Sequence, residues 1–181
     1  MDALDALLQR TASPRLAEPM PTENELESIY QAGLRAPDHG MLRPWRLLVV
    51  KDDGREKLGQ LFVDCMNPES EEQKTKLLNA PLRAPLIIIA VAEIQEHPKV
   101  PPVEQISAVA AAVQNMSVAI HAMGYSSIWR TGAVAFDDNV KNALGFRSHD
   151  EIVGLLYVGT PTVEREVPEN KIEDYFRDWE G

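Results

Sequence analysis

Apolar and polar residues alternate in blocks along this chain, and the blocks have the lengths of helices and strands. Runs of consecutive apolar residues predict strands at residues 45–51, 85–92, 125–130 and 151–158. The runs Leu47-Leu48-Val49-Val50 and Ile87-Ile88-Ile89 leave no polar side chain on either face, which is typical of strands buried on both sides. We therefore expect these strands to lie in the interior of the protein.

Helical spacing and capping residues predict most of the remaining elements. Thr22 and Glu25 have the spacing of a capping box, which begins a helix that continues to about residue 35. Shorter helices are expected at residues 3–10, around Leu58 to Phe62, and from Asp137 to residue 144. The polar segment 67–76 is expected to be an exposed, mobile connection with one or two helical turns.

The longest predicted helix, residues 104–123, is apolar on nearly every side. It is rich in Ala, has no Lys, Arg, Asp or Glu from Gln105 to Met123, and stops at Gly124. Such a helix lies in a protein core or crosses a membrane. Its scattered amides and His121 argue against the membrane. We expect a core helix or a subunit interface, and the small side chains favour a dimer seam.

The segment 35–45 joins a predicted helix to a predicted strand and carries an unusual set of side chains. Its sequence is Arg-Ala-Pro-Asp-His-Gly-Met-Leu-Arg-Pro-Trp. Pro37 should end the helix, and Pro44 should hold Arg43 in an extended conformation. Two interpretations are open. The segment is a stiff loop that presents cationic and polar groups to a ligand, or a connection that only needs turn residues.

Composition limits the classes of function. The 181 residues suit a single domain, 1–181, with a charged tail at 162–181 whose apolar residues should pack on its own subunit or on a partner. The net charge of −10 opposes broad binding to nucleic acid or to an anionic membrane. One Cys excludes an intramolecular disulfide, and the four His show no metal-ligand spacing. The acidic N-terminus lacks a signal-peptide pattern, so we expect a cytoplasmic protein.

Arginine is concentrated where predicted elements end, at Arg10, Arg15, Arg35, Arg43 and Arg130. In so acidic a chain this pattern indicates an anion site, because the planar guanidinium donates two hydrogen bonds to a phosphate. Each of these residues alone is equally well explained by a surface ion pair. The sequence contains no Walker A loop, no Gly-x-Gly-x-x-Gly fingerprint and no hydrolase elbow, and its paired carboxylates fit turns and caps.

Taken together, several segments resemble the nitroreductase family of flavin-dependent oxidoreductases, over nearly the whole chain. They are Arg10 to Arg15, Arg35-Ala36-Pro37 through Pro44-Trp45, the Ala-rich helix ending Met123-Gly124, Trp129-Arg130-Thr131-Gly132, and Leu156-Tyr157-Val158-Gly159-Thr160-Pro161. The Arg-Ala-Pro-Asp-His form is similar to the small NAD(P)H nitroreductase subgroup. The resemblance implies an α+β sandwich, with a mostly antiparallel central sheet flanked by helices, in an intertwined homodimer.

The resemblance also implies one FMN in each of two pockets at the dimer interface. One subunit would bind the phosphate and line the isoalloxazine through Arg10, Thr11, Ala12, Trp129, Arg130 and Thr131. Arg35 and His39 would reach in from the partner. The phosphate carries roughly −1.5 to −2 charges near neutral pH, so cations beside it are physically required.

The implied activity is that of an FMN-dependent oxidoreductase with a ping-pong mechanism. NADH or NADPH would deliver hydride to the flavin, and a small-molecule electron acceptor, such as a nitroaromatic or a quinone, would then take the electrons. The cofactor supplies this chemistry, so we expect no catalytic acid or base. A flavin-binding storage or sensor protein with little turnover is the alternative, and a dimer without cofactor is a third. Acceptor preference is expected to lie in residues 38–43.

Overall fold

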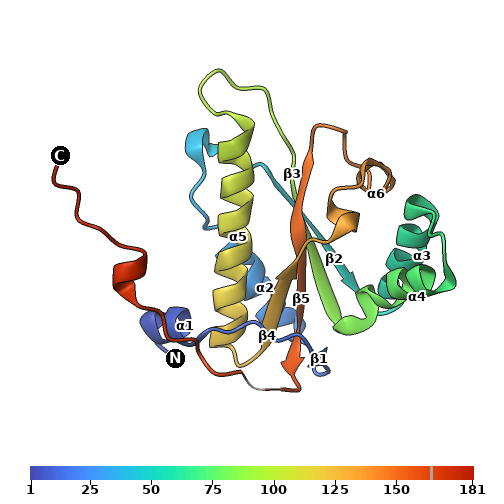
Figure 1. The fold of residues 1–181 in the computed structure, drawn as a ribbon, viewed down its shortest axis with the longest axis horizontal. Helices are drawn as coiled ribbons and strands as arrows, with labels where there is room; N and C mark the ends of the chain where they lie inside the picture. The colour runs from blue at the N-terminus through green and yellow to red at the C-terminus, as the bar shows by residue number, and fades with distance from the viewer. Residues whose placement is uncertain (164) are drawn as a thin grey trace.

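A five-stranded antiparallel sheet separates two helical layers in the computed structural model, which describes residues 1–163 and 165–181 (Figure 1). β3 (Leu86–Ala92) lies between β2 (Trp45–Lys51) and β5 (Glu151–Pro161). β4 (Ser126–Arg130) and the short β1 (Leu16–Ala17) both pair with β5 on its other side. The fold is therefore the α+β arrangement expected from the sequence, with the long β5 in contact with three other strands.

β3 is the strand most deeply enclosed by the two layers. All seven of its residues are buried. Leu86 and Ile88 pack in the cluster that contains the second and fifth helices, whereas Ile87 and Ile89 pack in the cluster under the third helix. Successive side chains of a strand point to opposite faces, so a run without polar residues fills both cores at once. The expectation of a doubly buried strand is confirmed here.

The same expectation is wrong for β2, which is an edge strand. Arg46 and Val49 are exposed, and the other residues of β2 are only half-buried. β2 pairs with β3 on one side alone, so its outer edge has no neighbour in the described chain. Arg46 and Lys51 place charges along that edge, as is common where an edge must not pair with other strands.

The helices divide between the two faces of the sheet (Figure 1). One layer contains α1 (Ala3–Gln9), α2 (Glu23–Gly33) and α5 (Pro102–Ala122). The other contains α3 (Gly54–Met66), α4 (Glu71–Asn79) and α6 (Asp138–Ala143). Short 3-10 turns lie at His39–Met41, Pro81–Arg83, Ala133–Ala135 and Ile172–Asp174.

Local capping signals predicted helix starts well. The Thr22 side chain accepts a hydrogen bond from the Glu25 backbone N–H, and the Glu25 carboxylate accepts one from the Thr22 N–H. Asp137 caps α6 in the same manner, through the N–H groups of Asn139 and Val140. These bonds satisfy N–H groups that have no partner inside the helix.

The segment 67–76 forms more helix than expected. α3 ends at Asn67, which has a left-handed φ of 45°, and Ser70 then caps α4 by accepting a hydrogen bond from the Gln73 N–H. α4 has nine residues rather than one or two turns. Its helical signal is weak in the sequence because Leu77 and Leu78 are its only apolar side chains.

The tail lies apart from the two layers in the single chain (Figure 1). Ile172, Tyr175, Phe176 and Trp179 are 68–89% exposed, so their packing on a partner subunit stays a prediction. α5 also leaves a stripe of Val103, Ser107 and Gln114 exposed on the side away from the sheet. Within the described residues, no helix combines the length and hydropathy needed to cross a membrane.

A buried carboxylate ties the start of β5 to the loop that follows β3. Asp150 is fully buried, and its Oδ1 accepts hydrogen bonds from the Ile94 N–H (2.9 Å) and from Arg147 Nη2 (2.8 Å). Its Oδ2 accepts from the backbone N–H and Nε of Arg147. Burial alone would raise the pKa of Asp150, but the hydrogen bonds from Arg147 and Ile94 outweigh it and lower the pKa.

We expect Asp150→Asn to reduce the free energy of unfolding by about 2 kcal/mol, because two charge-assisted hydrogen bonds are lost at a half-exposed Arg147. Since the folded pKa lies below the unfolded one, the carboxylate stabilises the fold above about pH 4 and stops doing so as pH falls through the folded pKa. Denaturant unfolding from pH 7 to pH 3, at fixed protein concentration, measures both effects. Asp178→Asn, an exposed tail residue with the same charge change, should leave both unchanged.

Candidate functional site

The first group of expected site residues meets at the outer edge of the sheet. Arg10 follows α1 in an extended conformation, and Ala12 forms a parallel bridge with Ser127 of β4. The Ser13 N–H donates to the Ser127 carbonyl at 3.3 Å. Residues 10–12 therefore run beside the strand that ends in Trp129 and Arg130. The chain brings these two predicted segments together, although they are far apart in sequence.

Trp129 is fixed across the neighbouring strand. Its Nε1–H donates to the Val153 carbonyl at 3.1 Å, and its side chain is 40% exposed. A Cβ built on Gly154 would lie 2.0 Å from Trp129 Nε1, so only glycine leaves room for the indole here. The hydrogen bond and the close packing thus hold Trp129 against β5 at the end of β4. Trp129 does not line the cavity that Arg130 and Thr131 border.

Arg130 and Thr131 line a cavity of about 490 Å³ between the end of β4 and α4. The guanidinium carbon of Arg130 lies 6.0 Å from the centre of the Tyr157 ring. Its Nε is buried and has no hydrogen-bond partner among the described residues. Gly132 adopts a φ of 67° with open space above it, which lets the backbone turn along the cavity wall. The volume is in the range of small-molecule sites.

Cations surround this cavity. Lys76, Arg83 and Arg130 line it, and none of its lining residues is acidic. No ion pair joins these three side chains to an acid within the described part of the chain. Burial raises the pKa of Tyr157, although Arg130 and Arg83 act in the opposite direction. The cavity can thus attract an anionic group or a developing negative charge.

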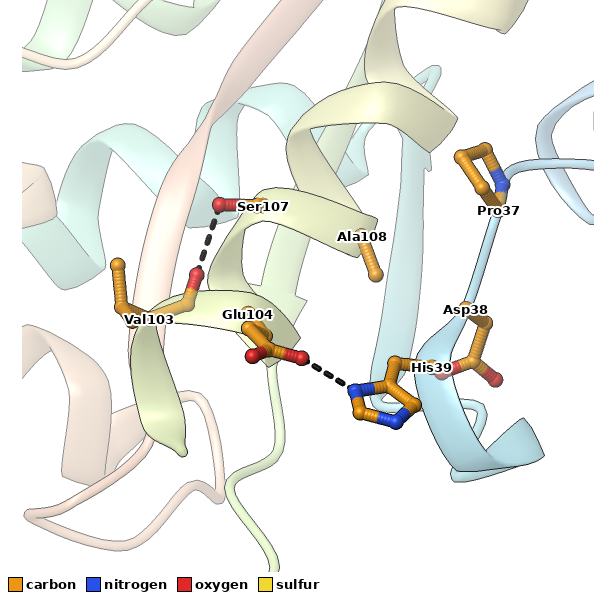
Figure 2. Close-up of a pocket in the computed structure, with 7 residues that line it drawn as sticks. All are labelled: Pro37, Asp38, His39, Val103, Glu104, Ser107 and Ala108. Atoms are coloured by element: carbon orange, nitrogen blue, oxygen red, sulfur yellow. Dashed lines mark hydrogen bonds and ion pairs between the residues drawn. The ribbon is translucent and has the colours of Figure 1, made fainter. Parts of the chain in front are cut away.

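The second group of expected residues lies in the other layer, against α5. Arg35 is exposed just after α2, and His39 follows in the 3-10 turn. His39 Nδ1 is 2.5 Å from Glu104 Oε2, a hydrogen bond between the loop and the first turn of α5 (Figure 2). The two side chains border an open hollow of about 320 Å³, together with Pro37, Ser107 and Ala108.

The loop from Asp38 to Arg43 has a strained backbone that hydrogen bonds hold in place. Gly40, Met41 and Arg43 all have left-handed φ values, of 73°, 52° and 50°. The Asp38 carboxylate accepts from the Arg43 N–H at 2.6 Å, and the Gln95 side chain donates to the Leu42 carbonyl at 2.8 Å. The expectation that Pro44 holds Arg43 extended is wrong, because the hydrogen bond to Asp38 closes the loop instead.

A buried amide supports this loop from behind. Gln105 is 1% exposed and donates to the carbonyls of Gln95 and Val100, while its own oxygen accepts from the Gln95 N–H. Gln105 thus joins α5 to the loop after β3, and Gln95 carries the connection on to residue 42. By contrast, the buried Nε2 of His121 has no partner among the described residues.

A single chain does not bring the two groups together. Arg130 and Thr131 line a cavity together with residues of α4, whereas His39 borders a hollow against α5 and Arg35 follows the end of α2. No residue lines both hollows. The expectation that Arg35 and His39 serve the site of a partner subunit agrees with this separation and stays a prediction.

Four residues that line these sites were not predicted as site residues from the sequence. Arg83 precedes β3 at the type of junction already noted for other arginines, so the same rule would have found it. Lys76 is hidden in a run that resembles an ordinary charged surface. Glu104 and Tyr157 acquire their roles only through contacts with residues distant in the chain.

Comparison with known proteins agrees with this architecture. The chain is 43% identical over 166 residues, 91% of each protein, to the Escherichia coli K12 protein named "Putative NAD(P)H nitroreductase YdjA". The structure matches a nitroreductase-like family protein from Bacillus cereus with a TM-score of 0.82 and 20% identity, over 100% of this chain and 97% of that one. It also matches a mutant of the FMN and NADPH-dependent nitroreductase NfnB from Sphigopyxis sp. strain HMH, with a TM-score of 0.76, 15% identity and all of both chains covered.

The family relationship rests on the sequence as well as on the fold. The family model described as "Nitroreductase family" matches residues 10–160. That range begins at Arg10, the first of the junction arginines, and ends within β5. It contains both the cationic cavity and the loop against α5. The chain therefore belongs to the nitroreductase family.

Proposed function

We propose that this protein is an FMN-dependent oxidoreductase that takes electrons from NADPH or NADH and passes them to a small-molecule acceptor. Nitroaromatics and quinones are the acceptor classes, and the two substrates react in ping-pong order. The active form is a cytoplasmic homodimer. The observation that carries the proposal is the cationic cavity at the end of β4, where the described residues supply no acid to the lining and no hydrogen-bond partner to the buried Arg130 Nε. The NADPH and FMN dependence of NfnB supports the choice of cofactors.

The residues at this edge fit FMN. The buried Nε–H of Arg130 finds no acceptor in the described part of the chain, and a carbonyl oxygen of a flavin would supply one. The open space above Gly132 leaves room for a flat ring against the backbone. Arg10 has no ion pair within the described residues, so its guanidinium is available for a phosphate.

The cofactor-binding residues have distinct tasks in this proposal. Arg10, Thr11 and Ala12 hold the phosphate beside β4, and Arg130 and Thr131 line the ring system in the cavity. Trp129, which lies outside the cavity lining of the single chain, borders the ring system from the end of β4. When bound, FMN supplies the reversible two-electron chemistry that lets donor and acceptor react in turn. Arg130, close to the low-polarity ring of Tyr157, stabilises negative charge at this edge without needing to reorganise. Arg35 and His39 complete the pocket from the partner subunit.

Glu104 gives His39 a defined orientation. Its carboxylate accepts the Nδ1–H of His39, which fixes the ring and leaves Nε2 for the partner's cofactor or acceptor (Figure 2). Because both side chains are partly exposed, the pair contributes geometry more than stability. His39 then shapes the pocket and does not act as an acid or base.

The proposed activity is tested by purifying the protein, recording its flavin spectrum and adding NADPH or NADH without oxygen. We expect bound or bindable FMN, bleaching by a nicotinamide, and recovery of the oxidised spectrum when a nitroaromatic or a quinone is added. Protein that binds FMN but is not reduced by either nicotinamide would be a flavin store or sensor. Protein that binds no FMN would contradict the proposal.

Arg35→Ala should weaken FMN binding about tenfold, the effect of losing one charge-assisted hydrogen bond. Fluorescence titration of FMN into the apoprotein measures the change, and circular dichroism shows whether α2 is intact. Lys57→Ala, which removes an exposed cation on α3 paired with Asp53, is the control and should bind FMN normally. Normal affinity in Arg35→Ala would make Arg35 structural.

Glu104→Ala should weaken FMN binding roughly fivefold, because His39 loses the hydrogen bond that orients it. The effect should disappear when His39 is already Ala, so the two substitutions are not additive. Ser107→Ala, on the same wall of the hollow, is the control. An equal loss of affinity with and without His39 would show that Glu104 acts on something else.

A further inference from the structure

α4 presents one helical face to the cationic cavity. Gln73, Lys76, Leu77 and Ala80 all line it, at the spacing that places residues on one side of a helix. Arg83, in the 3-10 turn that follows, continues the same wall. This wall is opposite the end of β4, and the proposed cofactor contacts do not use it.

The α4 wall has a charge opposite to that of the chain. The protein has 28 acidic and 18 basic residues, yet its lining here carries Lys76, Arg83 and Arg130 and no acid. Lys74 lies two residues from Lys76, is not part of the lining, and pairs with Glu71 at 3.9 Å. The half-buried Lys74 thus has an acid beside it, whereas the exposed Lys76 at the cavity has no partner among the described residues.

The other residues that line the cavity favour the binding of an aromatic ring. Met66, Leu77, Val134 and the ring of Tyr157 supply apolar surface beside the cations. The phosphate-binding segment 10–12 is not part of the lining, so a cofactor phosphate held there does not use these charges. The proposed flavin contacts use Arg130 but not Lys76 or Arg83, which leaves these two cations for another ligand.

We infer that the α4 wall selects electron acceptors that carry a negative charge, such as nitroaromatic or quinone compounds with a carboxylate or sulfonate substituent. The ring lies on the apolar surface, and the anionic substituent is held by Lys76 and Arg83. This inference rests on the proposed function. It also moves acceptor preference from the loop at 38–43, where the sequence suggested it, to the other layer of the protein.

The overall reaction for a nitro acceptor balances with the proposed donor. One NADPH and one proton reduce the nitro group by two electrons to a nitroso group, and NADP⁺ and water are released. The carboxylate or sulfonate takes no part in this change. Charge selection therefore appears in acceptor binding, and it should weaken as salt screens two exposed cations.

A matched pair of acceptors tests this directly. 4-Nitrophenylacetate and 4-nitrophenylacetamide differ in charge, while the methylene group keeps their nitro groups similar. With the FMN-loaded protein we expect kcat/KM to favour the acid roughly tenfold at low salt, and less at 0.5 M salt, the effect of two partly screened ion pairs. An equal or reversed preference overturns the inference.

Variants identify which cations are responsible. Lys76→Met and Arg83→Met should each reduce the preference roughly threefold, and Lys74→Met, the control on the same helix, should not change it. FMN affinity is measured in the same proteins. If either cavity variant loses FMN affinity but keeps the preference, these cations serve the cofactor and the inference is wrong.

Equilibrium dialysis tests the inference about acceptor charge independently of the proposed function. Binding of the two acceptors to oxidised protein is measured without NADPH, so it does not depend on turnover. If no nitroaromatic or quinone is reduced, the proposed function fails, and dialysis still shows whether the α4 wall prefers the anion. Tighter binding of the anion supports the wall's selectivity, and equal binding of both compounds overturns it.

Discussion

The antiparallel pairing of β5 with β3 on one side and with β4 on the other is the constraint on which both sites depend. It places Arg130 opposite Leu155 and the Trp129 indole over Gly154. Gly159 likewise lets Ala17 and Pro85 approach β5 closely, since a Cβ on Gly159 would lie 2.8 Å from the Ala17 carbonyl oxygen and from Pro85. A shift of one residue in this register would turn β4's side chains to the opposite face of the sheet and dismantle the cavity wall.

Some charged side chains have a partner of opposite charge and others do not. Several acids elsewhere in the chain pair with cations or cap helices, as Glu93 does with Arg46 and Asp137 does with α6. Arg10, Arg35 and the cations of the cavity have no such partners within the described residues. In the proposed function the cofactor and the acceptor supply the negative charge that these cations lack.

The sequence predicted those features that depend on neighbouring residues. The capping box at Thr22, the cap at Asp137 and the doubly buried β3 followed from local pattern alone. The partial exposure of β2 could not be predicted in this way, because an apolar run of the same kind occurs in central and edge strands. Only the strand order decides between the two. The residues 10–12 and 129–131 were found through the resemblance, and their proximity needed the bridge between Ala12 and Ser127.

The loop at 35–45 shows why the remaining features lay beyond sequence reasoning. Its shape depends on Asp38 closing on Arg43, on Gln95 reaching Leu42, and on a bond between His39 and Glu104 across 65 residues. Left-handed φ values at the two non-glycine residues Met41 and Arg43 cost free energy, which these bonds offset. A loop held this firmly while His39 stays more than half exposed is preorganised for something outside its own subunit. A second copy of the chain is the partner we propose, since the cationic cavity of each subunit lies in the opposite layer from its own loop.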